Sequence, residues 1–278
     1  MKNILVPLDF SADSINALEH AIRLANTTES NVVMLHVVHY KNFETPFYFS
    51  DLEDFKGKTV NDYINLILYR YQPQVNQNLT YQIVEGNVSR EIVKYAEDNK
   101  IDYIIMGTHG ASGSDSYWIG SNAYKVVSNA TCPVVTIRNG FMRDRINKIV
   151  LPIDASKNTR RKLPFTADMA AFFDAEIHVI GVTETAMSDI LKRVESWVKQ
   201  TDEYLEQRQI KHVTMMLQGS NITEMTIDYA KSIDADLIAI MTEQGEHPVS
   251  LLMGAYAQHM VNNSPIPVLT LRPTLAYQ

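Results

Sequence analysis

The chain has 278 residues, of which 45% are hydrophobic and 21% charged, and its formal net charge at pH 7 is -7. This composition is typical of a folded globular protein and excludes fibrous and largely disordered classes. A negative charge without a long basic run disfavours nucleic acid and anionic membranes as main partners. The single cysteine, Cys132, cannot form a disulfide within the chain, which favours a reducing compartment.

The N-terminal apolar run is interrupted by Pro7 and Asp9, too early for the core of a signal peptide. No apolar stretch has the length needed to cross a bilayer. We therefore expect a cytoplasmic protein.

The sequence repeats itself, with four segments recurring in the same order in its two halves. The matched pairs are 3–11 with 147–156, 31–38 with 175–182, 101–110 with 235–244, and 132–138 with 266–272. The repeat predicts a duplication, with a first domain over 1–140, a second over 145–278, and a short polar boundary between them.

Each repeated segment is a short run rich in Val, Ile and Leu between turn residues, which is typical of strands buried on both faces of a parallel sheet. Helical spacing of apolar residues separates these strands. Helices are expected after Ser11, around 92–96, from Gly120, over 50–72 and over 187–208, and Pro164 should displace the first turn of its helix. The fold class is therefore α/β, with two tandem doubly wound, mostly parallel sheets and helices on both faces.

A glycine-rich loop follows the strand that ends at Met106. Its pattern is G-x2-G-x9-G-S, formed by Gly107, Gly110, Gly120 and Ser121. The first two glycines allow a sharp turn and a close approach of phosphate to backbone amides, and the last two residues open a helix whose N-terminus attracts anions. The alternative is that these glycines only form turns. Asp9, at the end of the first strand, has two readings of equal weight: an acceptor for the amine of a base, or a helix N-cap.

With these motifs, the whole chain resembles a tandem universal stress protein of the UspA type, which has a Rossmann-like, adenine nucleotide alpha hydrolase-like fold. The resemblance lies in 6–11, 36–38, 106–110, 120–121 and 132–135. It implies that Asp9 and Val38 contact adenine and that the glycine loop surrounds ribose and phosphates of ATP. The complete predicted site is Pro7, Leu8, Asp9, Val38, Met106, Gly107, His109, Gly110, Gly120, Ser121 and Asn122. For His109, a filler of the turn is an equal alternative.

The loop departs from the family pattern. Ala123 replaces a second hydroxyl, and residues 111–119 carry Asp115 but no Lys or Arg. A carboxylate near a triphosphate is unfavourable unless a divalent cation lies between them. Binding is therefore expected to be weak, to depend on Mg²⁺, or to favour ADP or AMP.

The second half departs further. Met241, Gln244 and Ala255 stand where the first half has Gly107, Gly110 and Ser121. We expect a degenerate copy and one nucleotide site per chain, with a shifted loop through Gly245 as the alternative.

Other polar groups carry less information. Arg160, Arg161 and Lys162 are expected on a solvated helix face, with an anion site at the first helix of the second half as the alternative. The histidines and the cysteine show no ligand spacing, so no zinc site is expected.

No nucleophile elbow or Walker A lysine motif is present, so no catalytic residue is assigned and the chain is at most a slow ATPase. A nucleotide-binding regulatory module is therefore favoured over a tandem interaction module that binds no nucleotide, or a slow hydrolase. The family resemblance implies a role in stress response. Strands 134–138 and 268–272 are apolar and terminal in each half, which predicts pairing between the halves or a homodimer.

Overall fold

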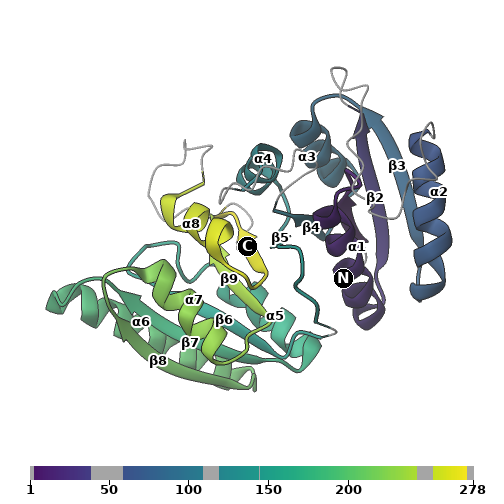
Figure 1. The fold of residues 1–278 in the computed structure, drawn as a ribbon. Helices are drawn as coiled ribbons and strands as arrows, with labels where there is room; N and C mark the ends of the chain where they lie inside the picture. The colour runs from purple at the N-terminus through teal and green to yellow at the C-terminus, as the bar shows by residue number, and fades with distance from the viewer. Residues whose placement is uncertain (1–2, 39–58, 109–118, 144, 243–252, 274–278) are drawn as a thin grey trace. The chain divides into compact units, whose positions relative to one another are not determined.

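The computed structural model describes residues 3–38, 59–108, 119–143, 145–242 and 253–273 (Figure 1). By its internal contacts the chain divides into two compact units. Unit 1 comprises Met1–Val126 and Val134–Asp144, and unit 2 comprises Val127–Pro133 and Arg145–Gln278. Each unit is an α/β structure in its own right.

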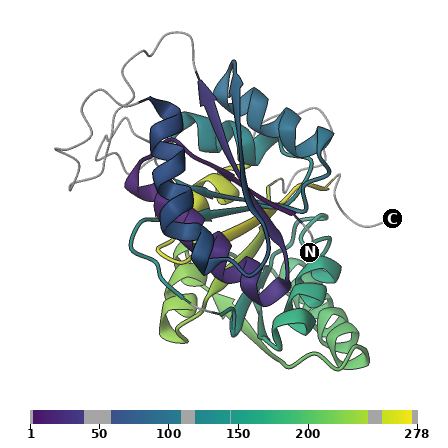
Figure 2. The same ribbon diagram turned by 90° about the vertical axis from the view of Figure 1, so that its right-hand side faces the viewer.

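Unit 1 alternates strands and helices along the chain. Its elements are β1 (Asn3–Pro7), α1 (Ala12–Thr28), β2 (Asn31–Val38), α2 (Val60–Tyr71), the 3-10 turn η2 (Gln72–Gln74), β3 (Leu79–Glu85), α3 (Val88–Asp98), β4 (Tyr103–Gly107), α4 (Ser121–Asn129), of which only the part up to Val126 belongs to this unit, and β5 (Val134–Ile137). The strand order is β3-β2-β1-β4-β5, and the paired strands are parallel. Helices α1 and α2 lie on one face of this sheet and α3 on the other (Figure 2), so the predicted doubly wound arrangement is confirmed.

Unit 2 repeats the same plan. Its elements are β6 (Lys148–Ile153), α5 (Leu163–Phe173), β7 (Glu176–Thr183), α6 (Ser188–Gln207), β8 (His212–Gln218), α7 (Ile222–Ser232), β9 (Leu237–Met241), α8 (Ala255–Asn263) and β10 (Val268–Leu271). Its strands follow the order β8-β7-β6-β9-β10 and are also parallel.

The central strands are almost completely buried because helices cover both faces of each sheet. In β1 the side chains of Ile4, Leu5 and Val6 are fully inaccessible to solvent, and in β6 so are those of Ile149 and Val150. These residues form the core that fixes the carboxyl ends of the strands.

Two strands were not predicted from the sequence. β3 and β8 are the outer strands of their sheets, and most of their residues are exposed or only partly buried. Polar residues interrupt both strands, for example Thr80 and Gln82 in β3 and Thr214 in β8. They therefore lack the continuous apolar run by which the inner strands were recognised.

Helix starts follow from local capping. The side chain of Ser11 accepts a hydrogen bond from the backbone of Ser14 at 3.2 Å and caps α1 as expected.

In unit 2, the predicted displacement of the first helical turn by Pro164 is confirmed. Helix α5 begins only at Leu163, with the proline in its first turn, and turns precede it. The predicted helix over 50–72 is observed as α2 within the part that the structure describes.

Candidate functional site

The strand order of unit 1 reverses between β1 and β4. These strands are neighbours, with Ile4 paired to Tyr103 and Leu5 to Ile104. After β1 the chain crosses towards β2, whereas after β4 it crosses towards β5. The connections therefore leave the carboxyl ends of β1 and β4 in opposite directions, and this is the position at which open α/β sheets bind ligands.

Asp9 stands just beyond β1 at this position and is half-buried. One oxygen of its carboxylate, Oδ1, accepts hydrogen bonds from the backbone N–H and the hydroxyl of Ser11, at 3.1 and 2.6 Å. The N-cap of α1 is Ser11, so the alternative reading of Asp9 as the cap is wrong. Asp9 instead orients the residue that caps the helix.

The backbone next to Asp9 adopts a conformation that L-residues seldom use. Phe10 has a φ of 64°, in the left-handed region, while its side chain is fully buried. Its ring packs against His36, with centroids 4.8 Å apart, and against Tyr63 at 5.7 Å. This packing holds a sharp turn that separates Asp9 from the start of α1.

His36 supports the same turn from β2. Its Nδ1 lies 2.8 Å from the carbonyl oxygen of Leu8 and donates a hydrogen bond to it. Burial lowers the pKa of His36 and outweighs the opposing effects of that bond and of the Asp9 charge. The imidazole is therefore neutral near pH 7 and serves as a positioning residue for the end of β1.

Gly107 ends β4 and faces the first turn of α1. A Cβ at this position would lie 2.7 Å from the Cβ and 2.9 Å from the carbonyl carbon of Asp13. Its φ is not among the left-handed values, so the expected sharp turn is not what requires glycine here. The missing side chain instead allows the backbone of α1 to pass directly over the end of β4.

The two ends of the glycine loop, at Thr108 and Gly120, lie next to each other at the edge of the sheet. The backbone N–H of Thr108 donates to the carbonyl of Ile137 at 3.1 Å, and that of Gly120 donates to the carbonyl of Thr108 at 2.8 Å. The loop is thus closed at its base next to the β1–β4 position. His109, Gly110 and residues 111–118 lie outside the described residues.

Helix α4 begins at this closed base. The backbone N–H of Tyr124 donates to the carbonyl of Gly120 at 2.9 Å, which makes Gly120 the residue that precedes the first turn. Ser121 and Asn122 follow and are exposed. The N–H groups of a first helical turn have no carbonyl partner within the helix and carry a partial positive charge, so this end of α4 suits an anion.

Of the remaining predicted residues, Pro7 and Val38 lie at strand ends, and Leu8 and Met106 are buried in the core. Pro7 is the last residue of β1 and pairs with Leu35, so Val38 at the end of β2 extends beyond it at the same edge. The side chains of Leu8 and Met106 are only 3% and 6% exposed. Both side chains belong to the core at the ends of their strands.

Unit 2 keeps the same loop base. The backbone N–H of Thr242 donates to Leu271 at 2.9 Å, and that of Gly254 donates to Thr242 at 2.8 Å. Asp154 also repeats the role of Asp9, because its Oδ1 accepts from the N–H and hydroxyl of Ser156 at 3.1 and 2.6 Å. The backbone frame of the site is therefore conserved between the units.

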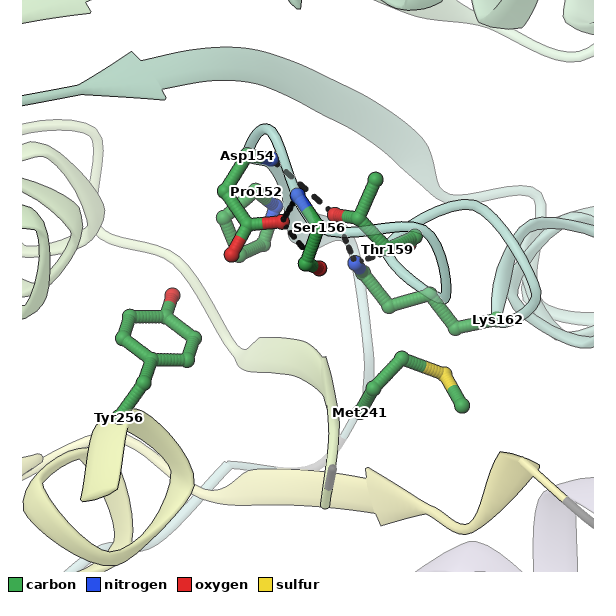
Figure 3. A pocket seen from close by; sticks show the side chains of 7 residues that line it. All are labelled: Pro152, Asp154, Ser156, Thr159, Lys162, Met241 and Tyr256. Atoms are coloured by element: carbon green, nitrogen blue, oxygen red, sulfur yellow. Dashed lines mark hydrogen bonds between the residues drawn. The ribbon is translucent and has the colours of Figure 1, made fainter. Parts of the chain in front are cut away.

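Side chains fill this frame in unit 2. The space between β6 and β9 is a pocket of only about 10 Å³, the room of a single water molecule. Met241 and Lys162 project into it beneath Asp154, as Figure 3 shows, and Tyr256 faces it from α8. The residues that line it are Pro152, Asp154, Ser156, Thr159, Lys162, Met241 and Tyr256.

Lys162 contradicts its predicted place on a solvated helix face. It is 2% exposed, and its Nζ donates to the carbonyl oxygen and, at 3.4 Å, to the hydroxyl of Thr159. Burial lowers the pKa of Lys162 to about 8, although the charge of Asp154 opposes this shift. Arg160 and Arg161 are also basic, so the sequence alone does not show which of the three side chains is buried. The turns before α5 decide it.

The two units thus define a class of protein: a tandem of doubly wound α/β units, each with a helix N-terminus at its topological switch point. No helix in the described ranges is long and apolar enough to span a membrane. The model of the universal stress protein family matches residues 1–138 and 145–272, and the chain belongs to that family.

Individual relatives match one unit at a time. Universal stress protein MJ0531 of Methanocaldococcus jannaschii is 30% identical over 143 residues, which are 49% of this chain and 82% of the relative. MJ0577 of the same organism is 29% identical over 153 residues, covering 49% of this chain and 94% of the relative.

Two solved structures share the complete fold. A universal stress protein from Archaeoglobus fulgidus has a TM-score of 0.68 at 16% identity, covering 97% of this chain and 96% of that one. A Pseudomonas aeruginosa protein of unknown function has a TM-score of 0.69 at 16% identity, covering 99% and 93%. At this identity the likeness concerns the fold alone.

Proposed function

We propose that unit 1 binds an adenine nucleotide at the β1–β4 switch point and that the chain acts as a nucleotide-binding regulatory module with one site. The observation that carries this proposal is the meeting of three features at one edge: a carboxylate after β1, the closed base of the glycine loop after β4, and the exposed first turn of α4. Ligands of open α/β sheets bind at such positions.

The adenine would lie at the ends of β1 and β2. Asp9 offers a carboxylate held in place through Ser11, and a carboxylate accepts a hydrogen bond from an exocyclic amine. Val38, half-buried at the end of β2, offers an apolar surface beside it. These residues supply the two kinds of contact that a purine needs.

The phosphates would lie at the first turn of α4, where Ser121 and Asn122 present backbone N–H groups. The same edge carries the carboxylates of Asp9 and Asp13, both half-buried. Negative charge next to a triphosphate is unfavourable without a counterion. We therefore expect Mg²⁺ to strengthen ATP binding more than it strengthens AMP binding.

Unit 2 is proposed to bind no nucleotide. Ligand pockets generally have volumes of about 300–1,000 Å³, and the pocket of unit 2 has about 10 Å³. Met241 stands at the strand end where unit 1 has Gly107, and Met241 and Lys162 both line this small pocket. The preserved backbone frame is then explained as a remnant of the duplication.

The proposal is tested by calorimetric titration of nucleotide-free protein with ATP, ADP and AMP, with and without Mg²⁺. The informative variant is Ser121→Glu, which puts a negative charge where the phosphates would bind. Ser121 is exposed in the first turn of α4, where an acidic residue favours the helix, so the fold should be retained. Ala255→Glu is the matched control, since Ala255 is the exposed first residue of α8 in unit 2.

We expect one ATP per chain in the wild type, at least tenfold weaker binding for Ser121→Glu, and unchanged binding for Ala255→Glu. Absence of binding by the wild type, or equal loss in both variants, would refute the proposed site.

A further inference from the structure

The C-terminal part of α6 and the first residue of β8 bring three metal-binding side chains together, far from the switch point. Asp202 and Glu206 are four residues apart on α6 and therefore share one helix face. His212 opens β8 after a short turn. One ligand atom from each of the three lies within 4.8 Å of the others.

Both ring nitrogens of His212 face hydrogen-bond acceptors. Its Nδ1 lies 2.7 Å from the carbonyl oxygen of Ile210, and its Nε2 lies 3.1 Å from Oδ1 of Asp202. Both partners only accept hydrogen bonds, while a neutral imidazole has one donor and one acceptor nitrogen. If Nδ1 donates to Ile210, the lone pair of Nε2 in a neutral ring faces the carboxylate of Asp202, and a metal ion bound between these two atoms would satisfy both.

His178 shows how the same chain satisfies a histidine without extra charge. Its Nε2 lies 2.9 Å from a carboxylate oxygen of Glu176, and its Nδ1 lies 2.8 Å from the hydroxyl of Tyr229. A hydroxyl donates as well as accepts, so neutral His178 can donate to Glu176 and accept from Tyr229. Among the described residues, the hydrogen-bond partners of His212 are a carbonyl and a carboxylate, neither of which can donate.

Electrostatics around His212 also favour a cation. Glu206 lies in the last turn of α6, which contains no basic residue. A helix C-terminus carries partial negative charge, and an acidic side chain there is unfavourable. Asp202 is 42% exposed and His212 only 11%, so an ion at this place would be open to solvent on the carboxylate side and held by protein on the imidazole side.

We propose that Asp202, Glu206 and His212 form a binding site for Zn²⁺ or a similar divalent transition metal. Two ligand atoms on a tetrahedral zinc lie about 3.3 Å apart, given bond lengths of about 2.0–2.1 Å, and the Asp202–His212 pair is already at 3.1 Å. The bond from Nδ1 to Ile210 is the outer-shell contact that fixes a metal-binding tautomer. An imidazole with carboxylates suits Zn²⁺ rather than Mg²⁺ or Ca²⁺.

Such an ion would join the end of α6 to the start of β8, an outer strand of its sheet. The turn between them passes through Gln209, whose φ of 56° is left-handed. The site is therefore structural in character, with solvent completing the coordination. It does not depend on nucleotide binding by unit 1.

The test is calorimetric titration of the full nucleotide-free chain with ZnCl₂ in a phosphate-free buffer, together with the visible absorption spectrum of bound Co²⁺. The variants are His212→Gln, Asp202→Asn and Glu206→Gln. His259→Gln is the control, because His259 is an exposed histidine on α8. Thermal melting of each variant without metal confirms that it is folded.

We expect one equivalent of Zn²⁺ to bind the wild type and the control, and each of the three site variants to bind it at least about tenfold more weakly. The Co²⁺ spectrum should be lost in His212→Gln. If the wild type binds no Zn²⁺, or if the site variants bind it as the wild type does, the proposed metal site does not exist.

Discussion

Gly107 and Asp13 are in such close contact that a single added carbon at Gly107 would lie 2.7 Å from the Cβ of Asp13. In unit 2 the same strand end carries Met241. Helix α1 begins three residues after Asp9, whereas α5 begins nine residues after Asp154, with turns in between. In unit 1 a glycine at the end of the fourth strand accompanies a first helix that starts early. In unit 2 a methionine at the same position accompanies a first helix that starts later.

Gly107→Ala is expected to destabilise unit 1. The new methyl group meets the backbone of α1, so the start of the helix must shift, and overpacking of this kind costs about 1–3 kcal/mol. The measurement is the urea midpoint of unfolding. Gly219→Ala is the control, because its methyl group would meet the sulfur of Met225, the mobile end of a long side chain, at 2.7 Å. Equal losses in the two variants would show that close helix packing is not what Gly107 provides.

Unit 1 should lose stability in acid because of His20. Burial, with a smaller effect of Arg23, lowers the pKa of His20 to about 4 from the usual 6.5. Between these values the unfolded chain binds the proton and the folded chain does not, so stability is fully present above pH 6.5 and falls as the pH approaches 4. The loss from this residue is about 3 kcal/mol.

His20→Leu tests that prediction. The Nδ1 of His20 is buried and has no hydrogen-bond partner among the residues that the structure describes, so an apolar side chain of similar size fits the site. The unfolding free energy of the variant should depend less on pH between 4 and 6.5 than that of the wild type. Parallel curves for the two proteins would contradict the assignment. His36 contributes in the same direction and remains in both.

Unit 2 should instead gain stability in mild alkali through Lys162. Its pKa is lowered to about 8 from the usual 10.5, so between these values the unfolded chain holds the extra proton. Unfolding free energy should therefore rise with pH over this interval, by about 3 kcal/mol from this group. Lys162→Met should remove the rise. The difference between wild type and variant isolates Lys162 from the tyrosines, and a difference independent of pH would contradict a buried ammonium.

The two Asp–Ser pairs provide a test of capping. Ser11→Ala removes the N-cap of α1 as well as its bond to Asp9 and should cost about 1 kcal/mol in unfolding free energy. Ser156→Ala removes the same bond to Asp154, but Ser156 precedes turns and caps no helix. Its effect should be smaller. A larger loss in Ser156→Ala would show that the aspartate contact, and not the cap, stabilises this corner.

The repeat and the apolar runs were sufficient to predict both units, since a strand buried on both faces has a distinctive sequence. β3 and β8 were missed because outer strands alternate with polar residues. The position of Asp9, Gly107 and Ser121 at one edge also followed from the sequence, because parallel strands bring their carboxyl ends together.

Contacts between residues that are distant in the chain could not be predicted from the sequence. The contact of Gly107 with α1 joins residues distant in the chain. Lys162 is buried because α5 starts late, and nothing distinguishes it locally from Arg161. His212 meets Asp202 only because a turn with left-handed Gln209 folds β8 back along α6. The proposed zinc site therefore gave no recognisable spacing in the sequence.

We propose that only one of the two duplicated units binds a nucleotide. Native mass spectrometry of the full chain with excess ATP and Mg²⁺ counts the bound molecules directly. We expect one nucleotide per chain, retained in Ala255→Glu and lost in Ser121→Glu. Two nucleotides per chain, none, or one that persists in Ser121→Glu would contradict a single site in unit 1.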